Sequence, residues 1–201
     1  MNLTKTGDFS VELAGHTLEY LDDVHVYLVD GIIVPSVSQL LRSRFGGKYS
    51  GIPTEVLRKA AEAGTAVHEA VENFCETGEV ADLPEVQGFI ELKTEHGFEV
   101  ERNEVPIIIF DSDEPTAAGR LDLVLRMDGE IGGADIKRTY RLDKEYLKAQ
   151  LNLYRLGYLQ SYGIEWKFLK GIHLRNEVRR MVNIDIDEGL ARQILSEYKG
   201  D

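Results

Sequence analysis

The sequence is short of the residues that build disulfide-linked, cysteine-ligated or membrane-spanning proteins. It contains one cysteine, Cys75, so neither an intramolecular disulfide nor a site with four cysteine ligands can form within one chain. No run of about 18 apolar residues occurs, and the first residues lack the basic and apolar stretches of a secretory signal. These absences predict a protein that has no membrane span and works in a reducing, cytoplasmic setting.

Repeats, low-complexity tracts and linkers rich in glycine, serine or proline are also missing, which predicts a single domain over residues 1–201. The net charge of −12 argues against nucleic-acid binding only if the charge is evenly spread. It is not, because Lys137–Arg180 holds 11 basic and 4 acidic residues, whereas Glu69–Glu114 holds 2 and 14. The basic segment is suited to facing phosphate, although chance clustering on solvated faces explains the counts equally well.

Alternating apolar residues near the N-terminus predict β-structure. Turn residues at 22–23 and 30–31 separate short apolar runs, which predicts a β-meander over about residues 10–35. Ser36 and Gln39 have the spacing of a capping box, which predicts a short helix directly after the meander.

Helical and strand-like patterns then follow one another through the rest of the chain. Thr54 is predicted to cap a long helix through Thr77, and Gly64 inside it predicts a bend or a close approach. Together the patterns predict an α+β fold with a mixed central β-sheet flanked by helices. The remaining helices are expected at about 83–95, 143–162 and 188–198, and the strands at about 98–110, 117–127, 131–137, 165–174 and 180–186.

One segment, GRLDLVLRMDGEIGGADIKRT at residues 119–139, carries candidate chemistry. Its Asp-Gly pair at 128–129 predicts a hairpin turn, so Asp122 on the first strand lies roughly opposite Asp135 on the second. Period-two alternation puts Asp135 and Lys137 on one face, and the isoleucine between them faces the core. The hairpin therefore predicts two carboxylates that converge beside an ammonium group.

Two carboxylates a few ångströms apart repel each other unless a cation lies between them. Mg²⁺ prefers oxygen ligands and is often held by one or two carboxylates together with a substrate phosphate, which it polarises. A neighbouring lysine can steady the attacking hydroxide, or accept its proton if the pKa of the lysine is depressed. The plainer alternative is a surface Asp–Lys ion pair across the strands, which predicts no metal binding.

Four blocks of sequence, in this order, resemble the PD-(D/E)XK nuclease superfamily, and within it the RecB-type nucleases and related phage exonucleases. The resemblance implies a restriction-endonuclease-like αβββαβ core at about 54–186 that hydrolyses DNA with Mg²⁺ or Mn²⁺. The blocks are GTAVHEAVE from Gly64 to Glu72, GRLDLV with Asp122, ADIKRT with Asp135 and Lys137, and QLNLYRLGY with Gln150 and Tyr154.

The resemblance implies a role for each residue of the two central blocks. Asp122 and Asp135 would bind the metal together with the backbone carbonyl of Ile136. Lys137 would be the catalytic lysine. The first aspartate follows Leu121 where the family name has a proline, a departure that is common among RecB-type relatives.

The flanking blocks supply further candidates. His68 would ligate or border the metal, although a histidine in a helix rich in alanine and valine is ordinarily packed. Glu72 faces the same way and would hold the histidine tautomer, unless it is simply solvated. Glu104 resembles an acidic residue at that place in some relatives and is a further candidate ligand. Gln150 would orient Lys137 or the scissile phosphate, and Tyr154 would support that contact or touch DNA.

The resemblance implies an exonuclease of phage-type DNA recombination or repair, encoded by a bacterium or phage. An endonuclease of the same superfamily and an inactive DNA-binding protein are the alternatives. With Cys75 alone the chain cannot hold the iron–sulfur cluster of some relatives, and without a G-x-x-x-x-G-K-[ST] loop it needs a helicase partner for unwinding. A single-strand annealing protein and further copies of the chain are other expected partners. Candidate phosphate contacts are Arg42, Arg44, Lys48, Arg138, Arg141, Lys144, Lys148 and Arg155.

Overall fold

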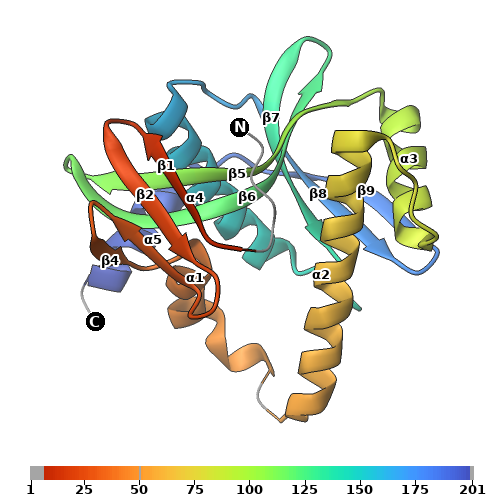
Figure 1. The fold of residues 1–201 in the computed structure, drawn as a ribbon, viewed down its shortest axis with the longest axis horizontal. Helices are drawn as coiled ribbons and strands as arrows, with labels where there is room; N and C mark the ends of the chain where they lie inside the picture. Colours follow the sequence, from red (N-terminus) through yellow and green to blue (C-terminus); the bar gives the residue numbers. More distant parts are fainter. Residues whose placement is uncertain (1–6, 50, 200–201) are drawn as a thin grey trace.

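The computed structural model describes residues 7–49 and 51–199, which form an α+β fold with five α-helices and two β-sheets (Figure 1). This confirms the predicted fold class. The strands are β1 (Phe9–Leu13), β2 (His16–Leu21), β3 (Val26–Val29), β4 (Ile32–Val34), β5 (Glu99–Asp111), β6 (Glu114–Met127), β7 (Glu130–Lys137), β8 (Phe168–Arg175) and β9 (Val178–Ile184). The helices are α1 (Val37–Phe45), α2 (Thr54–Thr77), α3 (Pro84–His96), α4 (Lys144–Tyr162) and α5 (Glu188–Lys199), with a 3₁₀ turn at Gly46–Tyr49.

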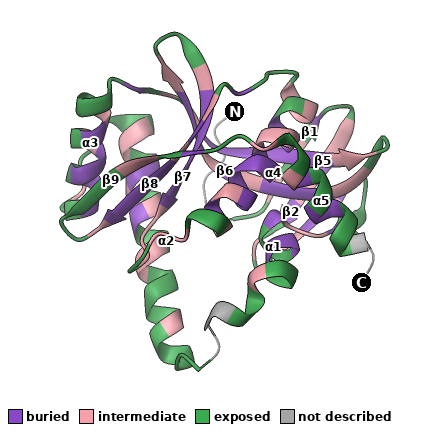
Figure 2. Ribbon diagram, turned by 180° about the vertical axis from the view of Figure 1, so that it is seen from behind, coloured by how far each residue is buried: buried purple, intermediate pink, exposed green. Residues whose placement is uncertain are grey.

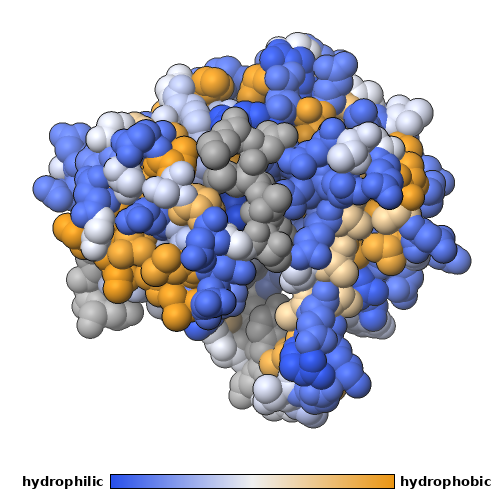
Figure 3. Space-filling view, viewed as in Figure 1, coloured by the Kyte–Doolittle hydropathy of each residue, from blue (hydrophilic) through white to orange (hydrophobic). Residues whose placement is uncertain are grey.

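The N-terminal meander is a four-stranded antiparallel sheet in the order β1-β2-β3-β4. Asp30 and Gly31, between β3 and β4, both have positive φ values of 51° and 78°, as a tight two-residue hairpin turn requires. Ile32 and Ile33 of β4 are about 70% exposed, at 71% and 69%. Figure 3 shows hydrophobic surface on this part of the molecule.

The central sheet has the order β5-β6-β7-β8-β9, and each neighbouring pair is antiparallel except β7 and β8. The predicted hairpin turn between β6 and β7 is confirmed, because Asp128 and Gly129 have φ values of 51° and 81°. The parallel pair β7–β8 is joined through α4, which crosses the sheet between them. Such a crossover is the usual connection of parallel strands.

Two separate cores lie on the two sides of the central sheet (Figures 1 and 2). Helices α1, α4 and α5 pack on one side through a cluster that includes Ile107 and Trp166. Helices α2 and α3 pack on the other side through a cluster that includes Val71 and Ile136. A third cluster, around Ile108, joins the meander to β5 and β6.

Helix starts are predicted well where a side chain caps them. Ser36 and Gln39 form the predicted capping box of α1. The prediction that Thr54 caps α2 is wrong, because Pro53 occupies the N-cap position and no side chain caps this helix. The predicted close approach at Gly64 is also wrong, since a Cβ added there would meet nothing within 4 Å. Of the helices that the structure describes, none is long and apolar enough to cross a membrane.

Candidate metal centre

The candidate site forms where β6 and β7 stop pairing. The two strands pair from Met127 to Leu123, which lies opposite Ala134. One position further on, Asp122 uses its side chain instead: Oδ2 accepts the backbone N–H of Ile136 at 2.7 Å. The Asp122 side chain thus satisfies the backbone N–H of Ile136, which would otherwise bond to the neighbouring strand.

Three side chains from different elements converge at this point. His68 of α2, Glu104 of β5 and Asp122 of β6 each offer a ligand atom, and these atoms lie within 4.8 Å of one another. All three were candidate metal ligands in the sequence. Glu104 is buried and has a φ of 45° in the middle of its strand, a strained conformation that non-glycine residues rarely adopt and that is common at functional sites.

The hydrogen bonding of His68 makes this cluster rich in acceptors. Nε2 lies 3.0 Å from the carbonyl oxygen of Ile136, so Nε2 carries the hydrogen and donates it. Nδ1, the other ring nitrogen, lies 3.4 Å from Asp122 Oδ2, where an unprotonated ring offers a lone pair. This buried Nδ1 has no hydrogen-bond partner among the described residues. When the imidazole is unprotonated, two acceptors face each other beside a second carboxylate, that of Glu104, and a cation between such groups stabilises them.

A small hollow lies beside the three side chains. Its volume is about 10 Å³, and Glu72 and Ile136 line it together with the three candidate ligands. That volume is about the least that a single water-sized particle needs. Carboxylate oxygens with one imidazole nitrogen suit Mg²⁺ and, because of the imidazole, Mn²⁺. The donor set and the size of the hollow therefore both fit one small divalent cation.

Asp135 and Lys137 form a close ion pair beside the cluster. Their Oδ2 and Nζ atoms are 2.5 Å apart, and the Asp135 side chain is only 2% exposed. Burial raises the pKa of Asp135 to about 6, an increase that Lys137 opposes and that the nearby charge of Asp122 reinforces. Asp122 therefore contacts His68 in the cluster and also acts through its charge on the Asp135–Lys137 pair.

The charge of Lys137 is set by the same carboxylates. Burial lowers the pKa of Lys137, but Asp135 and Asp122 outweigh burial and hold the pKa above its ordinary value. The side chain is consequently an ammonium at neutral pH. In this state it donates hydrogen bonds and stabilises negative charge, and it does not accept a proton.

Gln150 and Tyr154 lie one turn apart on α4, and both are buried. Oε1 of Gln150 has no hydrogen-bond partner among the residues the structure describes, which leaves an acceptor whose burial is costly. Burial, and next the charges of Asp122 and Asp135, raise the pKa of the Tyr154 hydroxyl well above its ordinary value. Tyr154 is therefore a protonated phenol close to both carboxylates.

The expectation that Glu72 holds the tautomer of His68 is wrong. The two ring nitrogens face the carbonyl of Ile136 and the carboxylate of Asp122. The Ile136 carbonyl, which accepts from Nε2, is therefore the group that orients the ring. Glu72 is buried on the wall of the hollow. The Ile136 carbonyl, a candidate ligand in the sequence, keeps a second lone pair while it accepts from His68.

A larger cleft of about 330 Å³ opens beside Asp122, Glu104 and Tyr154. Its outer wall comes from the meander and from the start of α1, and sequence reasoning did not connect these elements with the site. Arg120 was also missed: its Nε lies 3.1 Å from Glu104 Oε2, and both side chains are buried. Only its place two residues before Asp122 could have drawn attention to it. The other lining residues include Tyr20, His25, Tyr27, Ser38, Gln39 and Arg42.

Comparisons with known proteins do not assign a family. No protein-family model matches the sequence, and no curated protein matches it either. A solved structure, described as the crystal structure of SSO0001, is similar at 19% identity with a TM-score of 0.43. The similarity covers 79% of this chain and 68% of that chain. Function does not follow from a similarity this distant.

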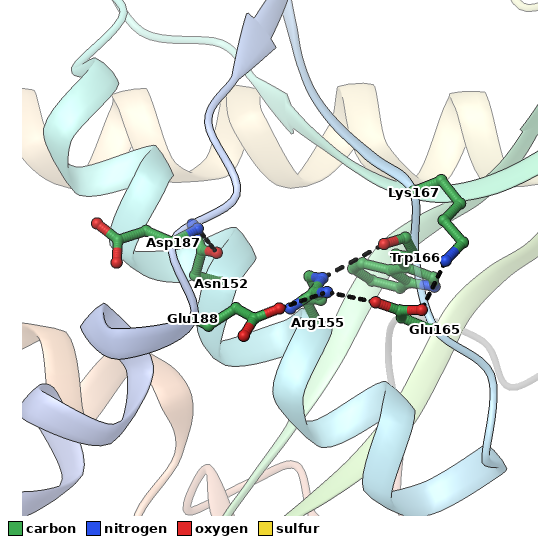
Figure 4. A network of polar contacts seen from close by, with 7 residues as sticks. All are labelled: Asn152, Arg155, Glu165, Trp166, Lys167, Asp187 and Glu188. Carbon is green, nitrogen blue, oxygen red and sulfur yellow. Dashed lines mark hydrogen bonds and ion pairs between the residues drawn. The ribbon is translucent and has the colours of Figure 1, made fainter.

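Several of the candidate phosphate contacts are engaged elsewhere. Arg155 donates to Glu165 and to the backbone of Trp166 and also pairs with Glu188 (Figure 4). Lys148 pairs with Asp187 at 3.0 Å on the same side of α4. The structure does not bring these two cations to the site, because acidic residues of the β8 and α5 segments hold them.

Of the other basic candidates, some are held by acidic residues and some line hollows near the site. Arg138 donates to the buried Glu85, and Arg44 pairs with Glu197. Arg42 lines the cleft beside Asp122, and Arg141 lines a hollow of about 240 Å³ beside Lys137. Lys144 is exposed at the start of α4, and the side chain of Lys48 lies outside the described residues.

Proposed function

We propose that this protein is a divalent-metal-dependent deoxyribonuclease that hydrolyses phosphodiester bonds at the site around Asp122. One observation carries the proposal: ligand atoms of His68, Glu104 and Asp122 lie within 4.8 Å of one another, with His68 Nδ1 3.4 Å from Asp122 Oδ2. These three ligand atoms could share one cation, and they lie next to the buried Asp135–Lys137 pair.

The residues that would hold the cation are His68, Glu104 and Asp122, with Asp135 and the Ile136 carbonyl as adjoining candidates. A bound Mg²⁺ or Mn²⁺ supplies Lewis-acid chemistry, since it polarises a phosphoryl oxygen and makes water more acidic. Binding would require Arg120 to share the Glu104 carboxylate with the cation.

The side chains of the chain itself perform the remaining tasks. The Lys137 ammonium, held by Asp135, stabilises the negative charge that develops on the phosphate during attack. The free acceptor of Gln150 and the phenol of Tyr154 orient Lys137 or the substrate. The surrounding cleft, with Arg42 on its wall, admits the negatively charged backbone of DNA.

The sequence resemblance further suggests an exonuclease that acts in phage-type recombination or repair in the cytoplasm, with a single-strand annealing protein or a helicase as partner. An endonuclease of the same superfamily is the alternative. A DNA-binding protein without turnover is the alternative from another class, and the retained Asp122, Asp135 and Lys137 argue against it.

The test is digestion of labelled linear DNA in Mg²⁺, in Mn²⁺ and in EDTA. We expect metal-dependent digestion by the wild type and a loss of at least about a hundredfold for Lys137→Ala, the usual size of such an effect. The matched control is Lys167→Ala, which removes an exposed lysine paired with Glu165. Digestion that persists in Lys137→Ala at the wild-type rate would contradict the proposal.

A further inference from the structure

A second, larger groove lies on the other side of the loop that follows Lys137. Its volume is about 950 Å³. One wall is the loop 138–143 with Arg175 of β8, and the other is the first half of α2. Thr139, Arg141 and Asp143 line both this groove and the smaller hollow beside Lys137. The groove therefore leads towards the candidate site.

The α2 wall is apolar although it is exposed. This half of the helix projects from the body of the molecule (Figure 1) and is exposed on most sides (Figure 2). Ile52 before the helix is 41% exposed and Val56 is 55% exposed. Leu57, Ala60 and Ala61 continue the same lining. An apolar stripe without a partner on a projecting helix is typical of a surface that binds something.

The opposite wall is cationic and carries an exposed aromatic ring. Tyr140 is 81% exposed, and the guanidinium of Arg175 lies 4.9 Å from the centre of its ring. Neither Arg141 nor Arg175 forms an ion pair with a carboxylate within the described part of the chain. The acidic residue of the lining, Asp143, accepts the N–H of Tyr146 at 3.1 Å as the cap of α4. Positive charge is therefore available on a chain whose net charge is −12.

The loop that carries these side chains is held in place from beneath. Buried Glu85 accepts from Arg138 and from the backbone N–H of Asn176, both at 2.8 Å. Buried His173 lies 2.7 Å from the carbonyl oxygen of Thr139 and donates through Nε2. These bonds hold Arg138 and Thr139 before Tyr140, and the hydroxyl of Thr139 donates to the carbonyl of Arg141 beyond it at 2.9 Å. The ring is consequently presented by a rigid support, which lowers the entropic cost of binding.

We infer that this groove binds an unpaired strand of nucleic acid on its way to Lys137, with a base stacked on Tyr140 and phosphates at Arg141 and Arg175. The inference rests on the proposed function and names the form of its substrate. An aromatic platform beside arginines binds single strands without regard to sequence. In a duplex the faces of the bases are covered, so stacking on Tyr140 requires an unpaired strand or a frayed end. The apolar stripe of α2 then borders the bases.

A protein partner fits the groove less well. A helix docked on the α2 stripe would bury apolar side chains, but it would leave Arg141 and Arg175 desolvated unless it supplied acids to both. A polyanion with apolar bases satisfies both walls at once. The charge of the loop wall therefore favours a nucleic acid over a second copy of the chain.

The test is binding of a fluorescent oligothymidylate and of a matched duplex, by anisotropy, in EDTA. We expect Tyr140→Ala to weaken single-strand binding about tenfold, in line with the effect of removing one stacking ring. Tyr140→Phe should bind as the wild type does, because it keeps the ring. Arg175→Gln should weaken binding and reduce its dependence on salt concentration. The controls are Tyr198→Ala and Arg192→Gln on α5, outside the groove lining.

The outcomes separate this inference from the proposed function. If Tyr140→Ala and Arg175→Gln both melt like the wild type and bind single strands equally well, the inference that the groove binds an unpaired strand is wrong. A dimer in sedimentation that Val56→Glu converts to monomer would overturn it too, since a second copy would then occupy the stripe. Single-strand binding that depends on Tyr140, in a protein that cleaves no DNA with any metal, would support the groove and overturn only the nuclease.

Discussion

At the scale of single residues, the site depends on buried charges that hold one another. Asp135 is 2% exposed and Lys137 is 22% exposed at the side chain, so neither charge is well solvated. Removing one partner of such a pair leaves the other buried and unpaired, which commonly costs about 3–5 kcal/mol. Replacing both partners costs much less. This asymmetry distinguishes a buried pair from the surface ion pair that the sequence left open.

A double-mutant cycle compares the stability cost of removing one partner of the Asp135–Lys137 pair with the cost of removing both. We expect Lys137→Met to lower the free energy of unfolding by about 3 kcal/mol, because Asp135 loses its counter-charge. The double variant Asp135→Asn/Lys137→Met should recover most of that loss. Urea unfolding at pH 8 gives the values. Equal and additive small losses would show instead that the two charges are solvated and independent.

Only part of the site was accessible to sequence reasoning. Asp122, Asp135 and Lys137 follow from an Asp-Gly turn and from period-two alternation, which are local properties. The contact of His68 with Ile136, at 3.0 Å, and the pairing of Arg120 with Glu104 join segments that are distant or irregular. The positive φ of Glu104 is invisible in a pattern that treats β5 as a regular strand.

At the scale of elements, small residues decide how strands and helices approach. Gly133 lies where a Cβ would come within 2.0 Å of the buried ring of Trp166, and at Gly171 one would come within 2.4 Å of Leu147. These glycines let α4 and the segment before β8 lie flat against the sheet. The existence of each element could be predicted from periodicity. The parallel pairing of β7 with β8 could not, because it depends on such long-range fits.

Two glycine substitutions should have opposite effects on stability. Gly133→Ala should destabilise the protein by roughly 3 kcal/mol, because the added methyl group overlaps Trp166. Gly64→Ala should stabilise it by about 1 kcal/mol, because the helix interior disfavours glycine and the added Cβ meets nothing within 4 Å. Thermal melting compares both with the wild type. A destabilised Gly64→Ala would mean that α2 has a partner at this point.

At the scale of the whole molecule, the uneven charge is partly cancelled within the fold. Three cations of the basic segment that was predicted to face phosphate are neutralised by ion pairs instead. Arg138 pairs with Glu85, Lys148 with Asp187 and Arg155 with Glu165. The cations that remain near the site are those of the loop after β7 and of the cleft beside Asp122. Counting charges along the sequence could not make this distinction, because the acidic partners of Arg138 and Lys148 come from other segments.

Whether the protein cuts linear or closed circular DNA distinguishes an exonuclease from an endonuclease. We expect a linear duplex with frayed or single-stranded ends to be degraded in Mn²⁺ while a covalently closed circle stays intact, since the proposed exonuclease needs an end. Gel electrophoresis of one plasmid, closed or linearised, gives the answer. Nicking or cutting of the closed circle at a comparable rate would favour the endonuclease.

Binding of Mn²⁺ tests the central claim most directly, because it asks whether the facing acceptors of His68, Glu104 and Asp122 hold a cation. Titration calorimetry on the wild type should give one site per chain, and Asp122→Asn/Asp135→Asn should abolish it. Lys167→Ala, matched as an exposed variant, should leave the site unchanged. Absence of Mn²⁺ binding in the wild type, or unchanged binding in the double variant, would contradict the account.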